Sequence, residues 1–485
     1  MLRHAVTLLV TLLFFLCAVR SSQAADPYNV LFLISDDLTK DALSCYGNTV
    51  CQTPNIDSLA ARGTLFTRAY CQGTYCGPSR ASMMSGFYPH ATGMLGYKSP
   101  RPMIGDRPMW PQHFKNHGYY SARVSKIFHM GVPGGIEAGT DGADDPRSWT
   151  ERFNSQGPEW QAPGIGETLE GNPDGKKPVV GGNTFVVVQA DGDDLAHSDG
   201  RTAEKACQLL REHRNEPFFL GVGFVRPHVP FVAPAKYFQP FPFAAMNLPE
   251  KYPDDWADIP KLGINYKTSQ NMKMNLQQQR KSVAGYYASV AYMDAQVGKV
   301  LATLKEEGLE DNTIVVFTSD HGYHLGQHDF WAKVSLHEES ATVPLIVCVP
   351  GKAPAICHSF AELIDLYPTT AALCGLPIPE EIQGVDFSPL LDNPKATVRD
   401  AAFVVNSNGF LIRDDRYAFM QYRENGSGGY ELYDMKEDPE QRNNLAELAE
   451  YRDVMEDRKA ALKQKLAEVR DHQLPVAKAN GSKEK

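Results

Sequence analysis

The chain has 485 residues, of which 42% are hydrophobic and 22% are charged, and its formal net charge is −10. These values are typical of a globular protein with a large core, and they exclude a fibrous or disordered chain. No run of Lys and Arg is dense enough to form a nucleic-acid-binding face, so we expect no nucleic-acid partner. An acidic protein that acts on an anionic substrate must concentrate its positive charge locally, inside a pocket.

The first 24 residues have the pattern of a signal peptide. A short basic region, Met1 to His4, precedes an apolar run over residues 5–19 that is too short to span a bilayer comfortably. Ser22-Gln23-Ala24 then places small residues where a signal peptidase cleaves. No later stretch is long and apolar enough for stable membrane insertion. We therefore expect the mature chain to be secreted or periplasmic, or lysosomal in a eukaryote.

Buried strands alternate with helices over most of the chain. Continuous apolar runs predict buried strands of a mostly parallel sheet, over residues 29–34, 217–224, 313–318 and 343–349. Helical patterns between them predict helices over residues 57–62, 202–214 and 282–307. This alternation predicts an α/β catalytic domain over residues 25–392, with helices on both faces of the sheet.

Two regions depart from this alternation. Gly, Pro and Asp crowd residues 131–200, which predicts a functional loop region over the active face. After residue 393 four short runs predict antiparallel strands, over residues 401–405, 409–413, 417–422 and 430–433. A charged amphipathic helix is predicted over residues 445–469. Residues 393–485 are therefore predicted to form a smaller C-terminal α+β subdomain.

Acidic residues follow two of the predicted strands. Asp36-Asp37 ends the first strand, and Asp320-His321 ends the strand over residues 313–318. Ligands of open α/β sheets bind beyond the carboxyl ends of the strands. Three carboxylates brought together there would repel one another unless a hard divalent cation, calcium or magnesium, neutralised them. Either pair alone would more often be a solvated strand end or a helix cap, but two such pairs favour a metal site.

Cys76 lies at the predicted start of a helix. Pro78 is a favoured first helical residue, and a helix N-terminus favours an anion. Arg80 lies one turn further on, where it can pair with a charged group at the same position. These features predict a thiolate nucleophile with a lowered pKa. The alternative is a structural or disulfide-bonded cysteine, which is the commoner fate in exported proteins.

Several motifs resemble one known family. Cys76-x-Pro78-Ser79-Arg80, with Gly86 after an apolar helix, resembles the signature of the type I sulfatases. Other segments along almost the whole mature chain resemble the same family: Asp36-Asp37, Cys45 to Gly47, Thr53 to Asp57, Gly118-Tyr119, Ser319 to Gly322 and Glu431 to Asp434. Residues 125–129, 227–231 and 326–333 are most similar to its iduronate 2-sulfatase branch. The resemblance implies an alkaline-phosphatase-like fold, a mostly parallel sheet between layers of helices.

The resemblance also implies the cofactors. In this family a maturation enzyme oxidises the signature cysteine to formylglycine, whose hydrate is the nucleophile. We therefore expect a formylglycine-generating enzyme as a partner and a formylglycine at Cys76. One calcium ion is expected to be held by the following groups: Asp36, Asp37, Asp320, His321 and an oxygen of the modified Cys76. His321 stands where many sulfatases carry Asn, and it matches the iduronate 2-sulfatase-like branch.

Further catalytic roles follow from the same resemblance. Arg80 would orient the formylglycine hydrate and counter its charge. Lys126 and Lys333 would clamp the sulfate oxygens, because fixed cations in a water-poor pocket stabilise the charge of the transition state. His129 would hydrogen-bond the formylglycine, and His228 would protonate the departing alcohol.

Four residues are weaker candidates for substrate binding. Arg226, just before Pro227 and His228, is placed to pair with a substrate carboxylate or a second sulfate. His328 follows the Asp-His pair in a loop near the predicted pocket, and Tyr97 and Lys98 lie in a loop that could face the sugar. Taken singly, such residues are more often turn or solvated surface residues.

The predicted activity is hydrolysis of a sulfate monoester, namely the 2-O-sulfate of a terminal uronate in a glycosaminoglycan-like saccharide. Another sulfated polysaccharide is one alternative substrate. A phosphoester or phosphonate hydrolase of the same superfamily is a second alternative, although such enzymes usually carry Thr or Ser in place of Cys76. A non-catalytic sugar-binding relative would be expected to lack Cys76, Lys126 or His228, and all three are present.

Overall fold

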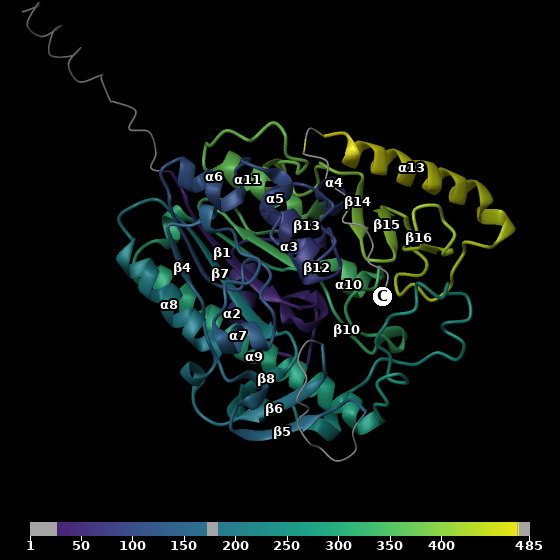
Figure 1. The fold of residues 1–485 in the computed structure, drawn as a ribbon, viewed down its shortest axis with the longest axis horizontal. Helices are drawn as coiled ribbons and strands as arrows, with labels where there is room; N and C mark the ends of the chain where they lie inside the picture. The colour runs from purple at the N-terminus through teal and green to yellow at the C-terminus, as the bar shows by residue number, and fades with distance from the viewer. Residues whose placement is uncertain (1–26, 172–182, 473, 475–485) are drawn as a thin grey trace, which may run out of the picture.

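The computed structural model describes residues 27–171, 183–472 and 474 (Figure 1). The predicted signal peptide, residues 1–24, lies outside the described residues. Among the residues that the structure describes, no helix has both the length and the apolar character needed to cross a bilayer.

A large mixed sheet forms the centre of the molecule (Figure 1). Its strands are β1 (Asn29–Asp36), β2 (Thr64–Tyr70), β3 (Tyr120–Ser125), β4 (Glu151–Phe153), β7 (Phe218–Pro227), β9 (Thr313–Ser319), β12 (Thr342–Cys348) and β13 (Ala355–Glu362). They lie in the order β13-β2-β12-β9-β1-β7-β3-β4. Every neighbouring pair is parallel except the two that β12 makes with β9 and β2.

The predicted mostly parallel sheet is therefore confirmed, with one correction. Residues 343–349 were predicted as a parallel strand, and β12 runs antiparallel instead. An apolar run indicates that a strand is buried on both faces, but it does not indicate whether the strand runs parallel or antiparallel to its neighbours.

Helices cover both faces of the sheet. The α-helices among the described residues are α2 (Pro54–Ala60), α3 (Cys76–Ser85), α4 (Pro89–Thr92), α5 (Arg101–Ile104), α6 (Trp110–Asn116), α7 (Gly134–Ala138), α8 (Ser198–Glu212), α9 (Leu276–Glu306), α10 (Glu338–Ala341), α11 (Leu366–Leu373), α12 (Ser388–Asp392) and α13 (Arg452–Arg470). Side chains of β1 alternate between the two faces. Val30 and Phe32 pack into a core with α3, α6 and α11, whereas Leu31 and Leu33 pack into a second core with α2, α8 and α9. All eight residues of β1 are buried as a result.

Residues 131–171 and 183–200, the described parts of the region over residues 131–200, contain more regular structure than predicted. It contributes β4 to the central sheet and two strands, β5 (Gly164–Thr168) and β6 (Val186–Ala190), to a smaller sheet with β8 (Phe231–Pro234). The expectation of one long loop region is therefore wrong. These strands are short, and the pairings of β4 with β3 and of β6 with β8 join segments well separated in the sequence, so the local pattern did not reveal them.

The C-terminal part contains a separate four-stranded antiparallel sheet, as predicted. Its strands are β14 (Ala401–Val405), β15 (Gly409–Asp414), β16 (Tyr417–Tyr422) and β17 (Tyr430–Asp434), and α13 packs beside them (Figure 1). The helix begins at Arg452 rather than near residue 445. The domain boundary between residues 392 and 393 stays a prediction, since Phe403 and Leu462 belong to the same hydrophobic core as Val30.

A two-stranded hairpin completes the part of the fold that bears on function. β10 (His324–Leu325) pairs antiparallel with β11 (Trp331–Ala332), shortly after the end of β9.

Candidate active site

Four neighbouring parallel strands end at one edge of the sheet. In the order β9-β1-β7-β3, Ser319 is in register with Ser35, Asp36 with Pro227, and Ser125 with Gly223. The residues at or just after these strand ends carry the chemistry predicted from the sequence: Asp36, Asp37, Lys126, His228, Asp320 and His321. Parallel pairing therefore brings together groups that are up to 285 positions apart, because the carboxyl ends of parallel strands share an edge.

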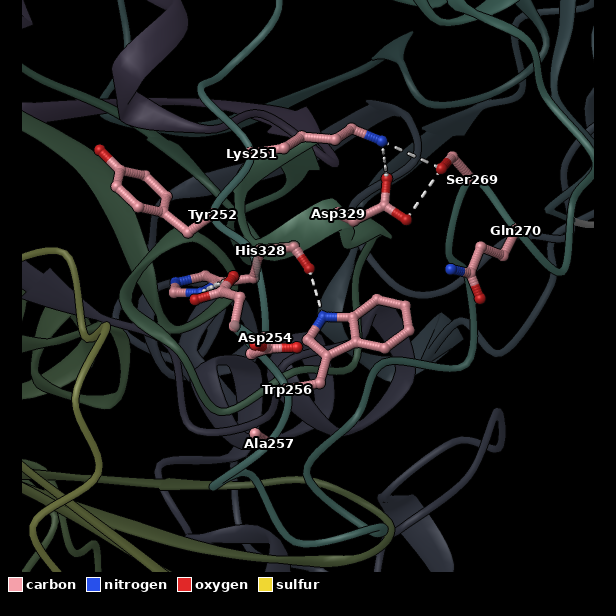
Figure 2. A pocket seen from close by; sticks show the side chains of 10 residues that line it. Lys251, Tyr252, Asp254, Trp256, Ala257, Ser269, Gln270, His328 and Asp329 are labelled. Atoms are coloured by element: carbon pink, nitrogen blue, oxygen red, sulfur yellow. Dashed lines mark hydrogen bonds and ion pairs between the residues drawn. The ribbon is translucent and has the colours of Figure 1, made fainter.

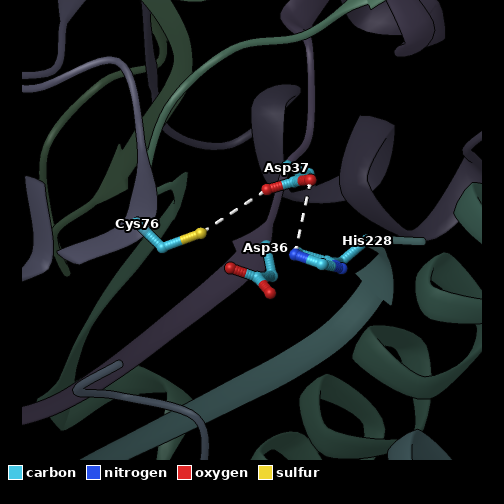
Figure 3. Close-up of side chains that lie close together, drawn as sticks. All are labelled: Asp36, Asp37, Cys76 and His228. Atoms are coloured by element: carbon cyan, nitrogen blue, oxygen red, sulfur yellow. Dashed lines mark hydrogen bonds and ion pairs between the residues drawn. The ribbon is translucent and has the colours of Figure 1, made fainter. Parts of the chain in front are cut away.

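Cys76 is the first residue of α3, and its side chain faces this edge (Figure 3). Its Sγ lies 3.3 Å from His321 Nε2, 3.4 Å from Lys333 Nζ and 3.7 Å from Asp37 Oδ1. All ten residues of α3 are buried, and Gly86 ends the helix in the left-handed conformation that favours glycine. The nucleophile candidate thus sits on a rigid, fully packed element.

The predicted low-pKa thiolate is not supported. Burial and the nearby Asp36 carboxylate raise the pKa of the Cys76 thiol above its usual value, and Lys333 opposes this shift without overcoming it. The anion-stabilising helix N-terminus does not compensate for removing the sulfur from water among carboxylates.

Arg80 links the two acidic strand ends. Its Nε donates to Asp320 Oδ2 at 2.8 Å and its Nη2 to Asp36 Oδ1 at 3.0 Å. Nη1 donates to the backbone oxygens of Lys126 and Ile127, so one guanidinium contacts three strand ends. Arg80, Asp36 and Asp320 are all 0% exposed. Such a network fixes the relative positions of its members, because each donor has a defined partner.

Two lysines pair with the two acids at the end of β1. Lys126 Nζ contacts Asp36 Oδ2, and Lys333 Nζ lies 2.7 Å and 2.9 Å from the two oxygens of Asp37. Burial alone would raise the pKa of Asp36, but Lys126 and Arg80 outweigh it and hold that pKa well below its usual range. The site therefore contains several buried, ionised groups of both signs.

Three histidines border the cluster. His321 donates from Nδ1 to Gly322 O at 2.8 Å, which leaves Nε2 facing Asp37 Oδ1 at 3.2 Å. His228 likewise donates from Nδ1 to Val229 O, and its Nε2 lies 3.7 Å from Asp37 Oδ2 on the opposite side from Cys76 (Figure 3). Burial lowers the pKa of His228 to about 3, although Asp37 opposes the shift, so its imidazole is neutral in the substrate-free site.

The ring of His129 packs against the ring of Tyr97. The two ring centroids are 4.3 Å apart, and His129 Nδ1 has no hydrogen-bond partner among the described residues. Burial lowers the pKa of His129 to about 2. Tyr97 comes close to the active-site helix because Gly77 has no side chain: a Cβ there would lie 2.2 Å from Gly96 O and 2.9 Å from the Tyr97 ring. Tyr97 is 51% exposed at this border, and the neighbouring Lys98 is exposed as well.

The donor set fits a hard divalent cation. Ligand atoms of Asp36, Asp37, Cys76 and His228 lie within 4.8 Å of one another, and so do those of Cys76, Asp320 and His321. Carboxylates supply two of the four donors in the first group and one of the three in the second, and Cys76 belongs to both. The Nδ1 hydrogen bond of His321 orients the ring so that Nε2 can act as a ligand. Calcium and magnesium both prefer oxygen ligands, so the residues present admit either ion.

Arg226 occupies a different position from the one predicted. It is 1% exposed, and its guanidinium pairs with Glu159 and donates to the backbone oxygens of His228 and Pro230. The expectation that it contacts substrate is therefore corrected: Arg226 holds the backbone that carries His228. Glu159 lies in the region where the sequence showed no clear pattern, and no local signal indicates that it would pair with a residue 67 positions away.

His328 lies outside the catalytic cluster. Its Nδ1 pairs with Asp255 Oδ2 at 3.1 Å, and Trp256 Nε1 donates to its backbone oxygen at 2.6 Å. These contacts place it in a neighbouring cavity, so it is not in contact with the groups around Cys76.

Comparisons with known proteins identify the family of the chain. A family model described as Sulfatase matches residues 28–376, and one described as N-sulphoglucosamine sulphohydrolase, C-terminal, matches residues 326–472. The chain is similar to iduronate 2-sulfatase of Homo sapiens, with 33% identity over 74% of this chain and 71% of that protein. It is also similar to a sulfatase of Formosa agariphila, with 30% identity over 90% of this chain and 86% of that protein.

Solved structures confirm the fold. A 2-O GAG sulfatase aligns with a TM-score of 0.70 and 24% identity over 93% of this chain and 95% of that chain. A phosphonate monoester hydrolase from Silicibacter pomeroyi aligns with a TM-score of 0.76 and 21% identity over 92% of this chain and 96% of that chain. At these identities the likeness establishes the alkaline-phosphatase-like fold and nothing finer. The Sulfatase family model, which spans more than half of the chain, and the relatives of 30% identity or more show that the chain belongs to the type I sulfatase family.

Proposed function

We propose that this sulfatase removes the 2-O-sulfate of a terminal uronate from glycosaminoglycan-like saccharides, after oxidation of Cys76 to formylglycine. The observation that carries the proposal is the position of Cys76. Its Sγ stands at the start of a buried helix, 3.4 Å from Lys333 Nζ and beside three carboxylates at the strand ends. A nucleophile, buried cations and a donor set for a divalent ion thus converge on one point.

Each group has a distinct part in the proposed reaction. Formylglycine would supply a hydrated aldehyde as nucleophile, and a calcium ion held by Asp36, Asp37, Asp320 and His321 would supply additional positive charge. Arg80 holds Asp36 and Asp320 in fixed positions, so the site needs little reorganisation when charge develops.

The remaining residues act on the sulfate group and the leaving alcohol. Lys126 and Lys333 bind the sulfate oxygens, and His129 hydrogen-bonds the formylglycine. His228 donates a proton to the leaving alcohol, since the negative charge of a bound sulfate ester favours the protonated imidazole. Tyr97 packs against His129 at the border of the site, and Tyr97 and its neighbour Lys98 would contact the sugar.

The choice of substrate rests on the relatives. Iduronate 2-sulfatases of mouse and human are 32% and 33% identical to this chain over about three quarters of its length. The proposal also includes export to the periplasm or the cell exterior, guided by residues 1–24, and a formylglycine-generating enzyme that modifies Cys76.

A second candidate is hydrolysis of phosphonate or phosphate monoesters. The structural similarity to phosphonate monoester hydrolases supports it. A phosphate monoester differs from a sulfate monoester in charge, because it carries up to two negative charges, whereas a phosphonate monoester carries one negative charge, as a sulfate monoester does.

The test is a substrate panel on protein produced with a formylglycine-generating enzyme. It compares a disaccharide with a 2-O-sulfated uronate at its non-reducing end, the same disaccharide sulfated only on the second sugar, and 4-nitrophenyl phosphonate esters. We expect sulfate release from the first compound at a kcat/KM at least about tenfold higher than from the second. Equal or faster release from the second compound would exclude the uronate assignment, and faster turnover of the phosphonate ester would favour the second candidate.

A further inference from the structure

A cavity of about 550 Å³ lies beside the β10–β11 hairpin and shares no residue with the catalytic cluster (Figure 2). Its volume is typical of pockets that bind small ligands. Its lining combines aromatic side chains with oxygen-bearing ones, notably Tyr252, Asp254, Asp255, Trp256, His328 and Asp329.

The polar groups of this cavity are held in place by hydrogen bonds. Asp329 accepts from Lys251 Nζ at 2.6 Å and from Ser269 Oγ at 2.8 Å (Figure 2). Trp256 is fixed through its Nε1, which donates to His328 O at 2.6 Å, and its ring stacks on Phe330. A lining fixed in this way is pre-organised for a ligand, since little side-chain freedom remains to be lost on binding.

His328 contributes a ring nitrogen to the lining. The residue is 5% exposed, and its Nδ1 pairs with Asp255. The other ring nitrogen, Nε2, can form a hydrogen bond with an occupant of the cavity.

The backbone around the cavity is also in an uncommon conformation. Asp254, His328 and Asp329 have φ angles of 61°, 55° and 55°, in the left-handed region that non-glycine residues rarely adopt. Asp and His adopt this region more readily than most residues, and residues held in it are often found at binding sites.

Charge and shape define the ligand class. Three aspartates face one lysine and one histidine, so the lining does not favour a sulfate or a carboxylate. Carboxylate oxygens accept hydrogen bonds from hydroxyl groups, and the faces of Trp256 and Tyr252 can pack against apolar ring faces. An uncharged sugar ring offers both kinds of surface.

The cavity lies within reach of the catalytic cluster. Asp329 lines it, and Lys333 of the active site is four residues away, so their Cα atoms are at most about 14 Å apart. One segment contacts both places: Asn265 Nδ2 donates to Lys333 O, and Ser269 donates to Asp329. A separation of this size is within the span of a short oligosaccharide.

We propose that this cavity binds an unsulfated, uncharged sugar residue of the saccharide whose terminal sulfate ester is hydrolysed at Cys76. The proposal rests on the proposed sulfatase function and narrows it. The preferred substrates are then saccharides whose sulfated end is followed by a neutral sugar. Saccharides with a second charged group at that position are poorer substrates.

A kinetic comparison tests the selectivity. The substrates are 4-nitrophenyl sulfate, which is too small to reach the cavity, and two tetrasaccharides that differ only in sulfation beyond the terminal residue. For Trp256→Ala we expect KM for the less sulfated tetrasaccharide to rise at least about tenfold more than KM for 4-nitrophenyl sulfate. Asp254→Asn should reduce the preference for the less sulfated tetrasaccharide, and Asn can adopt the left-handed backbone conformation of this position. The control variant Asp311→Asn, at an exposed position, should retain the wild-type preference.

A binding measurement isolates the cavity from the chemistry. Saturation-transfer NMR on the Cys76→Ala protein, with N-acetylglucosamine and its 6-sulfate as probes, needs no formylglycine and no turnover. We expect a signal for N-acetylglucosamine that exceeds the signal for its 6-sulfate and is lost in Cys76→Ala/Trp256→Ala. The absence of any signal, or a signal that survives the Trp256 change, overturns the proposal. Failure of the matured wild-type protein to hydrolyse any sulfate ester would instead overturn the proposed function. The NMR result would still show whether the cavity binds a neutral sugar.

Discussion

At the scale of single residues, the site is a buried ionic network. Arg80, Asp36, Asp320 and Lys126 are 0% exposed and contact one another directly. Buried charges are tolerated only when they are paired, and removal of one partner leaves the other without compensation. Each cation of the network is therefore needed for the geometry of the acids as well as for binding of an anion.

Lys333→Met tests this dual role. We expect kcat/KM for a sulfate ester to fall by about 100-fold or more, because a cation in contact with both Cys76 and Asp37 is lost. Steady-state kinetics on matured protein measures the effect, and the exposed Lys305→Met is the matched control. Activity within threefold of wild type in Lys333→Met would show that Lys333 does not face the reacting group.

Most residues of the candidate site could be predicted from the sequence because they belong to contiguous motifs. Asp36-Asp37, Cys76 with Arg80, and Asp320-His321 each carry their role within a few positions of the chain. Arg226 could not be predicted correctly, because its role depends on Glu159, a partner brought close only by the fold. The raised pKa of the Cys76 thiol was missed for the same reason, since it results from burial among carboxylates of other strands.

At the scale of elements, the end of β7 is held by two separate supports. The Arg226 side chain binds the backbone oxygens of His228 and Pro230 and pairs with Glu159. Asp199, in the first turn of α8, accepts hydrogen bonds from the backbone N–H groups of Val225 and Arg226 at 2.8 and 3.0 Å. These contacts fix the backbone next to His228 and thereby position its side chain.

A double-mutant cycle tests the first support. Arg226→Met and Glu159→Met should each lower the free energy of unfolding by about 3–5 kcal/mol, because each leaves a buried charge unpaired. The double variant should be no less stable than either single variant. Urea titrations give the stabilities, and kcat/KM for 4-nitrophenyl sulfate should fall in all three variants. Strictly additive losses of stability would contradict the pairing.

The second support predicts a pH dependence. Burial raises the pKa of Asp199 to about 6, although Arg226 and the two backbone donors oppose the shift. Its folded-state pKa thus lies above that of an unfolded Asp, about 3.9, so the stabilising contribution present below about pH 4 is lost as the pH rises through 6. The corresponding loss is on the order of 3 kcal/mol.

Unfolding free energies of wild type and Asp199→Asn between pH 4 and pH 7 would reveal this contribution. We expect the wild-type value to decline more steeply with rising pH than that of the variant, while Asp311→Asn keeps the wild-type slope. Parallel curves for wild type and Asp199→Asn would show that Asp199 does not titrate in this range.

Element positions were predicted more reliably than their directions. The runs over residues 29–34 and 313–318 became β1 and β9, since long apolar segments with β-branched residues are buried strands wherever they pack. The direction of β12 depends on the route of the connection before it, and the pairing of β4, β5 and β6 depends on distant partners. Neither property leaves a local signal.

At the scale of the whole molecule, two cores on opposite faces of the sheet hold the strand ends together. A cation bound by the acids of β1 and β9 would add a further link between these strands. A ligand that binds only the folded state stabilises it by about 2.7 kcal/mol at one hundred times its Kd.

The thermal midpoint should therefore rise with added calcium. Scanning calorimetry with and without a chelator measures the rise, and Asp36→Asn and Asp320→Asn should abolish it. Magnesium at the same concentration should give a smaller rise, because a site built from three carboxylates and a histidine offers few places for the waters that magnesium retains. An unchanged midpoint in calcium would contradict the metal site.

The central claim is that this sulfatase uses a nucleophile derived from Cys76, and one measurement tests it most directly. Matured wild-type protein and Cys76→Ala are compared for sulfate release from the 2-O-sulfated uronate disaccharide, with formylglycine at position 76 verified by mass spectrometry. The account predicts release by the formylglycine-bearing wild type and loss of at least about a thousandfold in Cys76→Ala. Comparable release by both proteins, or none by protein with verified formylglycine, would contradict it.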